Sequence, residues 1–162
     1  MTTILDRRTP AQPDAPRPLT LDSTGVWQGR YRTDVAARDF AFTVAEPEGL
    51  GGDDAGPNPL EYVLGGFQGC VAVVVETVAK ERGITIDDLR LGVSGTIDLR
   101  GFLGVPGVSP SFESIDGWVR LRADIDAEQF EGLIAETERR CPLYNLFRDA
   151  GVTPEIRWSL NV

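Results

Sequence analysis

The chain has 162 residues, enough for one domain with a sizeable core and too few for two. Its 25 acidic and 16 basic residues give a net charge of −9, which argues against nucleic acid or an anionic membrane as a partner. With no histidine and two cysteines, the sequence excludes histidine-based catalytic triads and the common zinc sites. We therefore expect neither a metal nor a cofactor.

Residues 1–19 are predicted to be a flexible, proline-rich tail, and residues 20–162 a single domain. The tail lacks the apolar core of a signal peptide and contains Pro10, Pro13, Pro16 and Pro18. The most apolar run, Tyr62–Val75, is too short to span a bilayer. We therefore expect a cytoplasmic protein with no membrane partner, in which both thiols rest reduced.

Two strands are predicted at the start of the domain, over residues 25–36 and 40–46. The second strand shows the apolar alternation of a half-buried strand at Phe40, Phe42 and Val44. A glycine-rich stretch follows and is predicted to be a loop.

A long helix is then predicted from Pro59 to about Glu81. Asn58 is a good N-cap, Pro59 suits the first helical position, and Glu61 stands where a capping box places its acid. The helix is apolar on almost every face, which indicates burial on every side. One small chain covers such a helix with difficulty, so we expect a second chain to help.

Glycines surround the cysteine of this helix. Gly65, Gly66 and Gly69 each cost about 1 kcal/mol relative to alanine in a helix interior, and close approach of another helix or a ligand is the usual reason for them. Beside Cys70 they remove side-chain bulk, so a small substrate could reach the sulfur.

The rest of the chain adds strands and two helices to the domain. Strands are expected over residues 89–99, 111–125 and 153–162, and helices begin after Asp126 and Cys141. The order β-β-α-β-β-α-α-β predicts an α+β fold class with an antiparallel sheet.

Both cysteines have an ordinary structural interpretation, because a lone cysteine in an apolar helix is usually an inert core residue. The surroundings of Cys141 favour another one. Pro142 makes Cys141 the N-cap of a helix, where the helix dipole stabilises a thiolate, and Arg139 and Arg140 precede it. An accessible cysteine of low pKa is typical of a redox thiol.

Four segments resemble the OsmC/Ohr family (osmotically inducible and organic hydroperoxide resistance proteins). GPNPLEY at residues 56–62 and GFQGC at residues 66–70 are similar to the family's GPNPxELLLAALGxC helix. RCPLYN at residues 140–145 is similar to its CPxSN segment, and WQGR at residues 27–30 resembles its first strand. The resemblance covers roughly Gly25 to Val162.

This resemblance implies an OsmC-like fold, with an antiparallel sheet wrapped around central helices in an intertwined homodimer. It implies a peroxidase that reduces organic hydroperoxides, in which Cys70 attacks the peroxide and Cys141 forms a disulfide with it. A lipoyl-type dithiol would then act as the reductant. The family also places an arginine beside the attacking sulfur: Arg30 is the first candidate, while Arg32 and Arg38 remain open.

One residue of the family's site is missing from its expected position. The glutamate that orients the arginine lies ten positions before the cysteine, which here is Leu60. Glu61 is the nearest candidate, although nine residues place it across the helix axis from Cys70 and it is also explained as a capping residue. Tyr144 replaces the usual serine of CPxSN, a lesser departure.

Two other interpretations remain open. An OsmC-like binding protein for an apolar small molecule would have little or no peroxidase activity, and Leu60 favours it. A structural stress-response subunit without any site is less consistent with the glycines beside Cys70.

Overall fold

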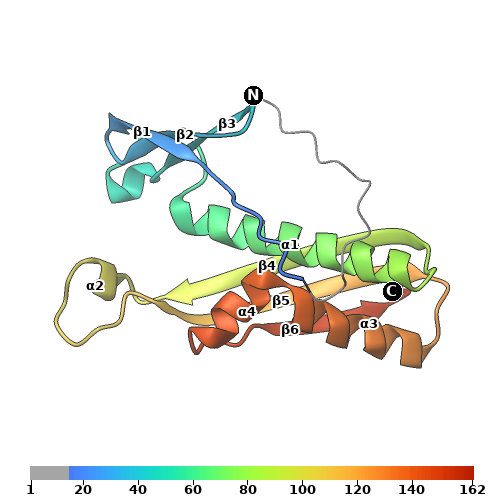
Figure 1. Cartoon of the computed structure of the whole chain (residues 1–162). Helices are drawn as coiled ribbons and strands as arrows, with labels where there is room; N and C mark the ends of the chain where they lie inside the picture. The colour runs from blue at the N-terminus through green and yellow to red at the C-terminus, as the bar shows by residue number, and fades with distance from the viewer. Residues whose placement is uncertain (1–14) are drawn as a thin grey trace.

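The computed structural model describes residues 15–162, and the part of the predicted tail over residues 1–14 lies outside them. Residues 15–23 form neither helix nor strand. The elements that follow are β1 (Thr24–Gly29), β2 (Arg32–Ala37), β3 (Phe40–Ala45), a 3-10 turn (Glu48–Leu50), α1 (Pro59–Glu81), β4 (Ile86–Ile97), α2 (Leu99–Phe102), β5 (Phe112–Ala123), α3 (Ala127–Arg140), α4 (Pro142–Asp149) and β6 (Glu155–Leu160). The predicted α+β class is confirmed (Figure 1).

The first sheet has the order β1-β2-β3 and is antiparallel throughout. The single strand expected over residues 25–36 is wrong, because the chain reverses there and β1 pairs with β2. Arg30 and Tyr31 form the turn with φ angles of 49° and 58°. Glycine and asparagine usually occupy such left-handed positions, and the turn signal available here was Gly29, which precedes the two residues with a φ of 87°.

The second sheet has the order β4-β5-β6. β4 and β5 pair antiparallel as expected, whereas β6 lies parallel to β5. The connection explains why β6 is parallel to β5. α3 and α4 lie between the two strands in the chain and return it to the end of the sheet where β5 begins, so β6 runs in the same direction as β5.

The core lies between one face of this second sheet and α1, α3 and α4. Every second residue of β5 from Ile115 to Ala123 is buried, while Trp118 lies on the opposite face. Phe67 of α1 and Leu133 of α3 close the core from the helix side, with 1% and 0% of their surface exposed. The strand predicted over residues 111–125 and the helix predicted after Asp126 are confirmed.

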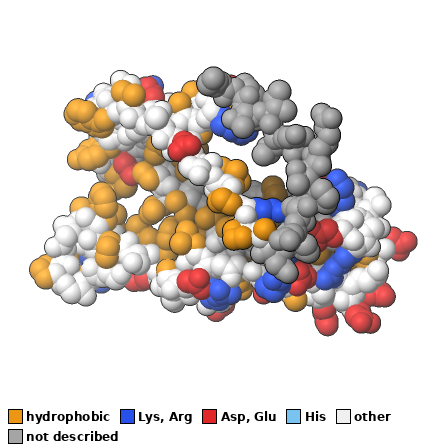
Figure 2. Space-filling model, viewed as in Figure 1, with side chains coloured by type: hydrophobic (Ala, Val, Ile, Leu, Met, Phe, Trp, Pro, Cys, Tyr) orange, Lys and Arg blue, Asp and Glu red, His pale blue; other side chains and the backbone are white. Residues whose placement is uncertain are grey.

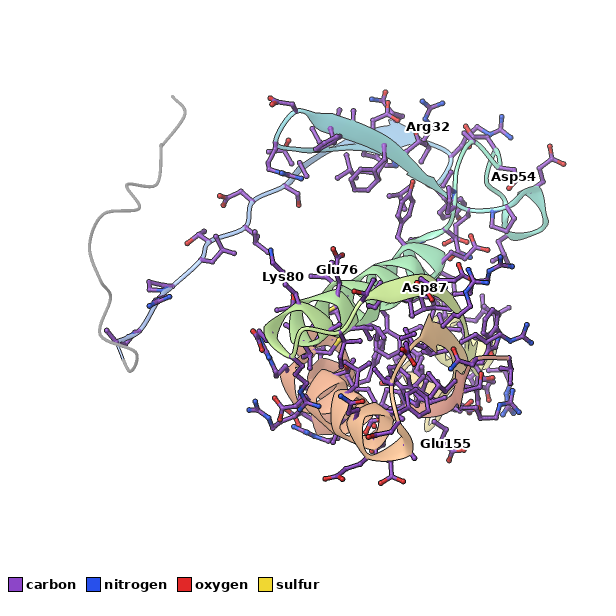
Figure 3. The ribbon with its side chains drawn as sticks, turned by 90° about the vertical axis from the view of Figure 1, so that its right-hand side faces the viewer. Arg32, Asp54, Glu76, Lys80, Asp87 and Glu155 are labelled. Carbon is purple, nitrogen blue, oxygen red and sulfur yellow. The ribbon has the colours of Figure 1, made fainter. Side chains whose placement is uncertain are left out.

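The first sheet meets the rest of the chain mainly at the start of α1. There the hydroxyl of Tyr62 donates to the carbonyl oxygen of Thr43 at 2.8 Å, and the rings of Phe42 and Tyr62 lie 4.9 Å apart. Farther along α1, Glu76 and Lys80 project from the side that looks toward this sheet (Figure 3).

The expectation that α1 is buried on every side is not met within one chain, since Val73 is 64% exposed. Trp27 of β1 and Phe102 of α2 are also exposed, and hydrophobic side chains gather on the side shown in Figure 2.

By length and composition alone α1 is long and apolar enough to span a membrane. Core helices of soluble proteins pass the same test.

Candidate active site

The structure brings the two cysteines together. The Cys141 thiol donates a hydrogen bond to the sulfur of Cys70, with the two Sγ atoms 3.1 Å apart. Both are free thiols; Cys70 is partly exposed on α1, and Cys141 is fully buried where α3 ends and α4 begins. A disulfide bond is about 2.05 Å long, so a movement of about 1 Å would join them.

Local sequence explains the position of Cys141. The residue is the N-cap of α4, as predicted, with Pro142 at the first helical position. Its sulfur accepts a hydrogen bond from the backbone N–H of Tyr144 at 3.4 Å. The sulfur therefore sits in the place that a serine or asparagine oxygen takes in other helix caps.

The expectation of an accessible thiol of low pKa is wrong for Cys141. The pKa of this thiol is raised to about 11, mainly by burial and to a lesser degree by the neighbouring Cys70, while the backbone N–H groups of Tyr144 and Leu143 lower it in part. The physical reason is that desolvation of the thiolate outweighs what the backbone N–H groups at the start of a two-turn helix can return. Cys141 therefore stays protonated at neutral pH.

Cys70 opens into a hollow of about 520 Å³. The hollow is lined mainly by small and apolar side chains from one face of α1, together with two residues next to Cys141: Gly66, Gly69, Cys70, Val73, Val74, Thr77, Arg140 and Pro142. Gly66 and Gly69 line the hollow beside Cys70 without adding side-chain bulk, as the sequence indicated. A Cβ built at Gly69 would meet no atom of another element within 4 Å, so the close approach of another helix is not seen there within the described residues.

Arg140, one of the lining residues, belongs to a charged pair. The Arg140 guanidinium binds both carboxylate oxygens of Glu81 at 2.6 and 2.9 Å, and these hydrogen bonds lower the pKa of Glu81. Sequence reasoning noted Arg140 but missed Glu81. The available signal was spacing, because Glu81 lies eleven residues after Cys70, about three helical turns along the same face.

The other predicted site residues have different partners within the chain. Arg30 donates to the carbonyl oxygen of Gly52 at 3.3 Å. The Glu61 carboxylate accepts from the backbone N–H of Asn58 at 2.7 Å, which completes the predicted capping box. Arg32 binds Asp34, and Arg38 lies over the ring of Phe40. None of these four candidates lines the hollow at Cys70 in the described part of the chain.

Metal ligands do not gather at this site. Among residues 15–162, no group of three or more Asp, Glu, His or Cys side chains is placed to hold a metal ion. The site therefore combines two adjacent thiols, one of them accessible, with an arginine that lines the same hollow.

Comparisons with known proteins bear on the family and the fold. Residues 51–157, more than half of the chain, match the family model described as OsmC-like protein, whereas no curated protein matches the chain. An OsmC-like protein from Mycoplasma pneumoniae has a similar structure, with a TM-score of 0.76 at 19% identity over 89% of this chain and 99% of that one.

Two solved organic hydroperoxide resistance proteins are similar as well. The one from Legionella pneumophila has a TM-score of 0.63 at 19% identity, covering 91% of this chain and 100% of its own. OhrB of Bacillus subtilis has a TM-score of 0.59 at 23% identity, covering 87% and 98%. At these identities the similarity establishes the fold alone.

Proposed function

This chain belongs to the OsmC-like protein family, and we propose that it is a thiol peroxidase that reduces organic hydroperoxides to alcohols. The observation that carries the proposal is the 3.1 Å separation of the Cys70 and Cys141 sulfurs. A reachable thiol next to a buried one is what a two-cysteine peroxide cycle requires. The names of two structural neighbours, organic hydroperoxide resistance proteins, agree with the proposal.

The proposed catalytic cycle has three steps. The Cys70 thiolate attacks one oxygen of the O–O bond, forms a sulfenic acid and releases the other oxygen as the alcohol after protonation. The Cys141 sulfur then displaces the sulfenic hydroxyl as water and forms the disulfide. A lipoyl-type dithiol reduces the disulfide by thiol–disulfide exchange and becomes a cyclic disulfide itself.

The walls of the hollow favour an organic hydroperoxide over hydrogen peroxide. Val73 and Val74 offer an apolar surface to the organic part of the substrate, and Cys70 lines the same hollow. Burial of an alkyl or aryl group there contributes roughly 25 cal/mol per Å² to binding, a gain that hydrogen peroxide does not obtain.

Arg140 is the cation that we propose for this site, since it lines the hollow that holds Cys70. A guanidinium there would stabilise the thiolate and the departing oxygen electrostatically. Arg30, the first candidate from the family resemblance, donates to the carbonyl oxygen of Gly52 within its own chain and does not line the hollow at Cys70. Glu61 would then act mainly as a helix cap.

We propose that the protein is a homodimer. Val73 of α1, Trp27 of β1 and Phe102 of α2 are each more than 60% exposed, a large apolar surface for a protein of this size. A second copy of the chain would bury it, in keeping with the apolar sequence of α1. Sedimentation equilibrium checks this proposal, and a monomer at micromolar concentration would contradict it.

The catalytic proposal is tested with cumene hydroperoxide and dihydrolipoamide. We expect wild-type protein to consume peroxide and Cys70→Ser to show only the background rate. In single-turnover mass spectrometry the wild type loses two hydrogens on disulfide formation, while Cys141→Ser gains oxygen. If wild type and Cys70→Ser consume peroxide equally, the alternative of an apolar-ligand binding protein is favoured; the engagement of Glu61 in its capping box supports that alternative.

The chain offers a matched control for Arg140. Arg139 is the adjacent residue, carries the same charge and forms the same kind of two-point ion pair, with Glu136 on its own helix. We expect Arg140→Ala to slow sulfenic acid formation at Cys70 roughly tenfold or more and Arg139→Ala to leave it nearly unchanged. A comparable loss in Arg30→Ala, with none in Arg140→Ala, would move the role to Arg30.

A further inference from the structure

The side chain of Asn145 lies at the junction that carries Cys141. Its amide nitrogen is within hydrogen-bond distance of three backbone carbonyl oxygens, those of Glu138 at 3.1 Å, Arg139 at 3.2 Å and Cys141 at 2.7 Å. All three neighbours are acceptors, so the nitrogen and not the oxygen of the amide must face them. One side chain of α4 thus binds the end of α3 and the residue between the two helices.

Two of these carbonyls, those of Glu138 and Arg139, would otherwise lack a partner among the hydrogen bonds of the described residues. The last carbonyl groups of a helix have no intrahelical N–H, and α3 ends at Arg140. An amide with two N–H groups shared among three acceptors satisfies them, and such shared hydrogen bonds are common at helix ends. The helical path can therefore break between α3 and α4 without leaving these part-buried and exposed carbonyl oxygens unpaired.

The peptide groups on both sides of Cys141 are held as a result. Its N–H donates to the carbonyl oxygen of Thr137 at 2.9 Å, and its own carbonyl accepts from both the backbone N–H and the side chain of Asn145. With the backbone fixed on both sides, the main freedom left to Cys141 is rotation about its Cα–Cβ bond. A small rotation moves the sulfur toward or away from Cys70.

We propose that Asn145 is a positioning residue for disulfide formation: it holds the backbone of Cys141 so that the sulfur stays directed at Cys70. The inference extends the proposed function, in which this disulfide is one step, but it applies to any oxidant that joins the two thiols. Asn145 touches neither sulfur in the hydrogen bonds described and acts through the backbone of Cys141. By holding this backbone, Asn145 raises the effective concentration of the Cys141 thiol at the Cys70 sulfur.

The test uses the full chain in glutathione redox buffers and contains no hydroperoxide. Oxidised glutathione takes two electrons from the two protein thiols and becomes two reduced glutathione molecules, so the equilibrium measures how strongly the fold favours the disulfide. We expect Asn145→Ala to lower the equilibrium constant about tenfold, since the loss of a hydrogen bond costs roughly 1 kcal/mol and this side chain makes more than one. Asn145→Asp should lower it further, because a carboxylate would face carbonyl oxygens at a helix C-terminus.

Asn161 is the matched control. Its side chain also bonds to the backbone at both atoms, accepting from the N–H of Ala123 and donating to its carbonyl oxygen, each at 3.1 Å, and its φ of 57° makes alanine unfavourable there. We expect Asn161→Ala to lower the melting temperature while changing the glutathione equilibrium less than twofold. If Asn145→Ala does not fold, Asn145→Ser serves as the milder variant.

A second measurement separates positioning from general damage. In a Cys141→Ser background, alkylation of Cys70 by iodoacetamide should proceed at the same rate with and without the Asn145→Ala substitution, since Asn145 does not act on Cys70. An unchanged glutathione equilibrium in Asn145→Ala, or an equal fall in Asn161→Ala, would overturn the inference. A normal equilibrium in a wild type that fails to consume hydroperoxide would instead count against the proposed function alone.

Discussion

The two thiols should differ sharply in reactivity, and the size of the difference follows from the burial of Cys141. An ordinary cysteine thiol has a pKa of about 8.5, whereas burial raises that of Cys141 to about 11. At pH 7.5 the thiolate population of Cys141 is then roughly 300-fold smaller than that of an ordinary cysteine, because each pKa unit is a factor of ten. Replacing Cys70 removes only the contribution of Cys70 to the raised pKa of Cys141, and the contribution of burial remains.

The assay is the reaction of each single-cysteine variant with Ellman's reagent at about pH 7.5. We expect Cys141→Ser, which retains Cys70, to react at least roughly a hundredfold faster than Cys70→Ser, which retains Cys141. The slow rate should rise about tenfold per pH unit toward pH 10, and both variants should react equally in urea. Folded-state rates within about tenfold of each other would contradict this prediction, since they would require a Cys141 that is neither buried nor shifted in pKa.

Three further predictions concern stability. Replacing the buried Phe67 by alanine should lower the free energy of unfolding by about 3–5 kcal/mol in urea titration, whereas replacing the exposed Leu146 should change it by less than about 0.5 kcal/mol. Gly52→Ala should destabilise by about 1–3 kcal/mol, because its Cβ would overlap the carbonyl oxygen of Glu46, while Gly49→Ala meets no atom and should be neutral in the same assay. Since Cys141 has a folded pKa of about 11 and an unfolded pKa of about 8.5, its contribution is complete below about pH 8.5 and lost toward pH 11, so the reduced wild type should lose more stability over that window than Cys141→Ala.

Local signals in the sequence identified several elements well. The capping box of Asn58 and Glu61 forms as expected, and Cys141 caps α4 with Pro142 behind it. These features depend on residues within one helical turn of each other, so propensity and local hydrogen bonding decide them. The turn at Arg30 and Tyr31 was missed for the same reason, because neither residue carries a local signal for a left-handed conformation.

Local patterns in the chain were sufficient to predict the fold class, the element that carries each cysteine and, through the motifs, the family. By themselves they do not predict which groups meet across 71 residues of chain: the pairing of Cys70 with Cys141 was expected only from the family resemblance, and the pairing of Arg140 with Glu81 was not expected at all. Contact between Cys70 and Cys141, the high pKa of the buried thiol and the pairing of Arg140 with Glu81 all depend on how α1 packs against α3 and α4. They became visible in the folded chain, because burial and the distance between remote segments are properties of packing and not of any local pattern.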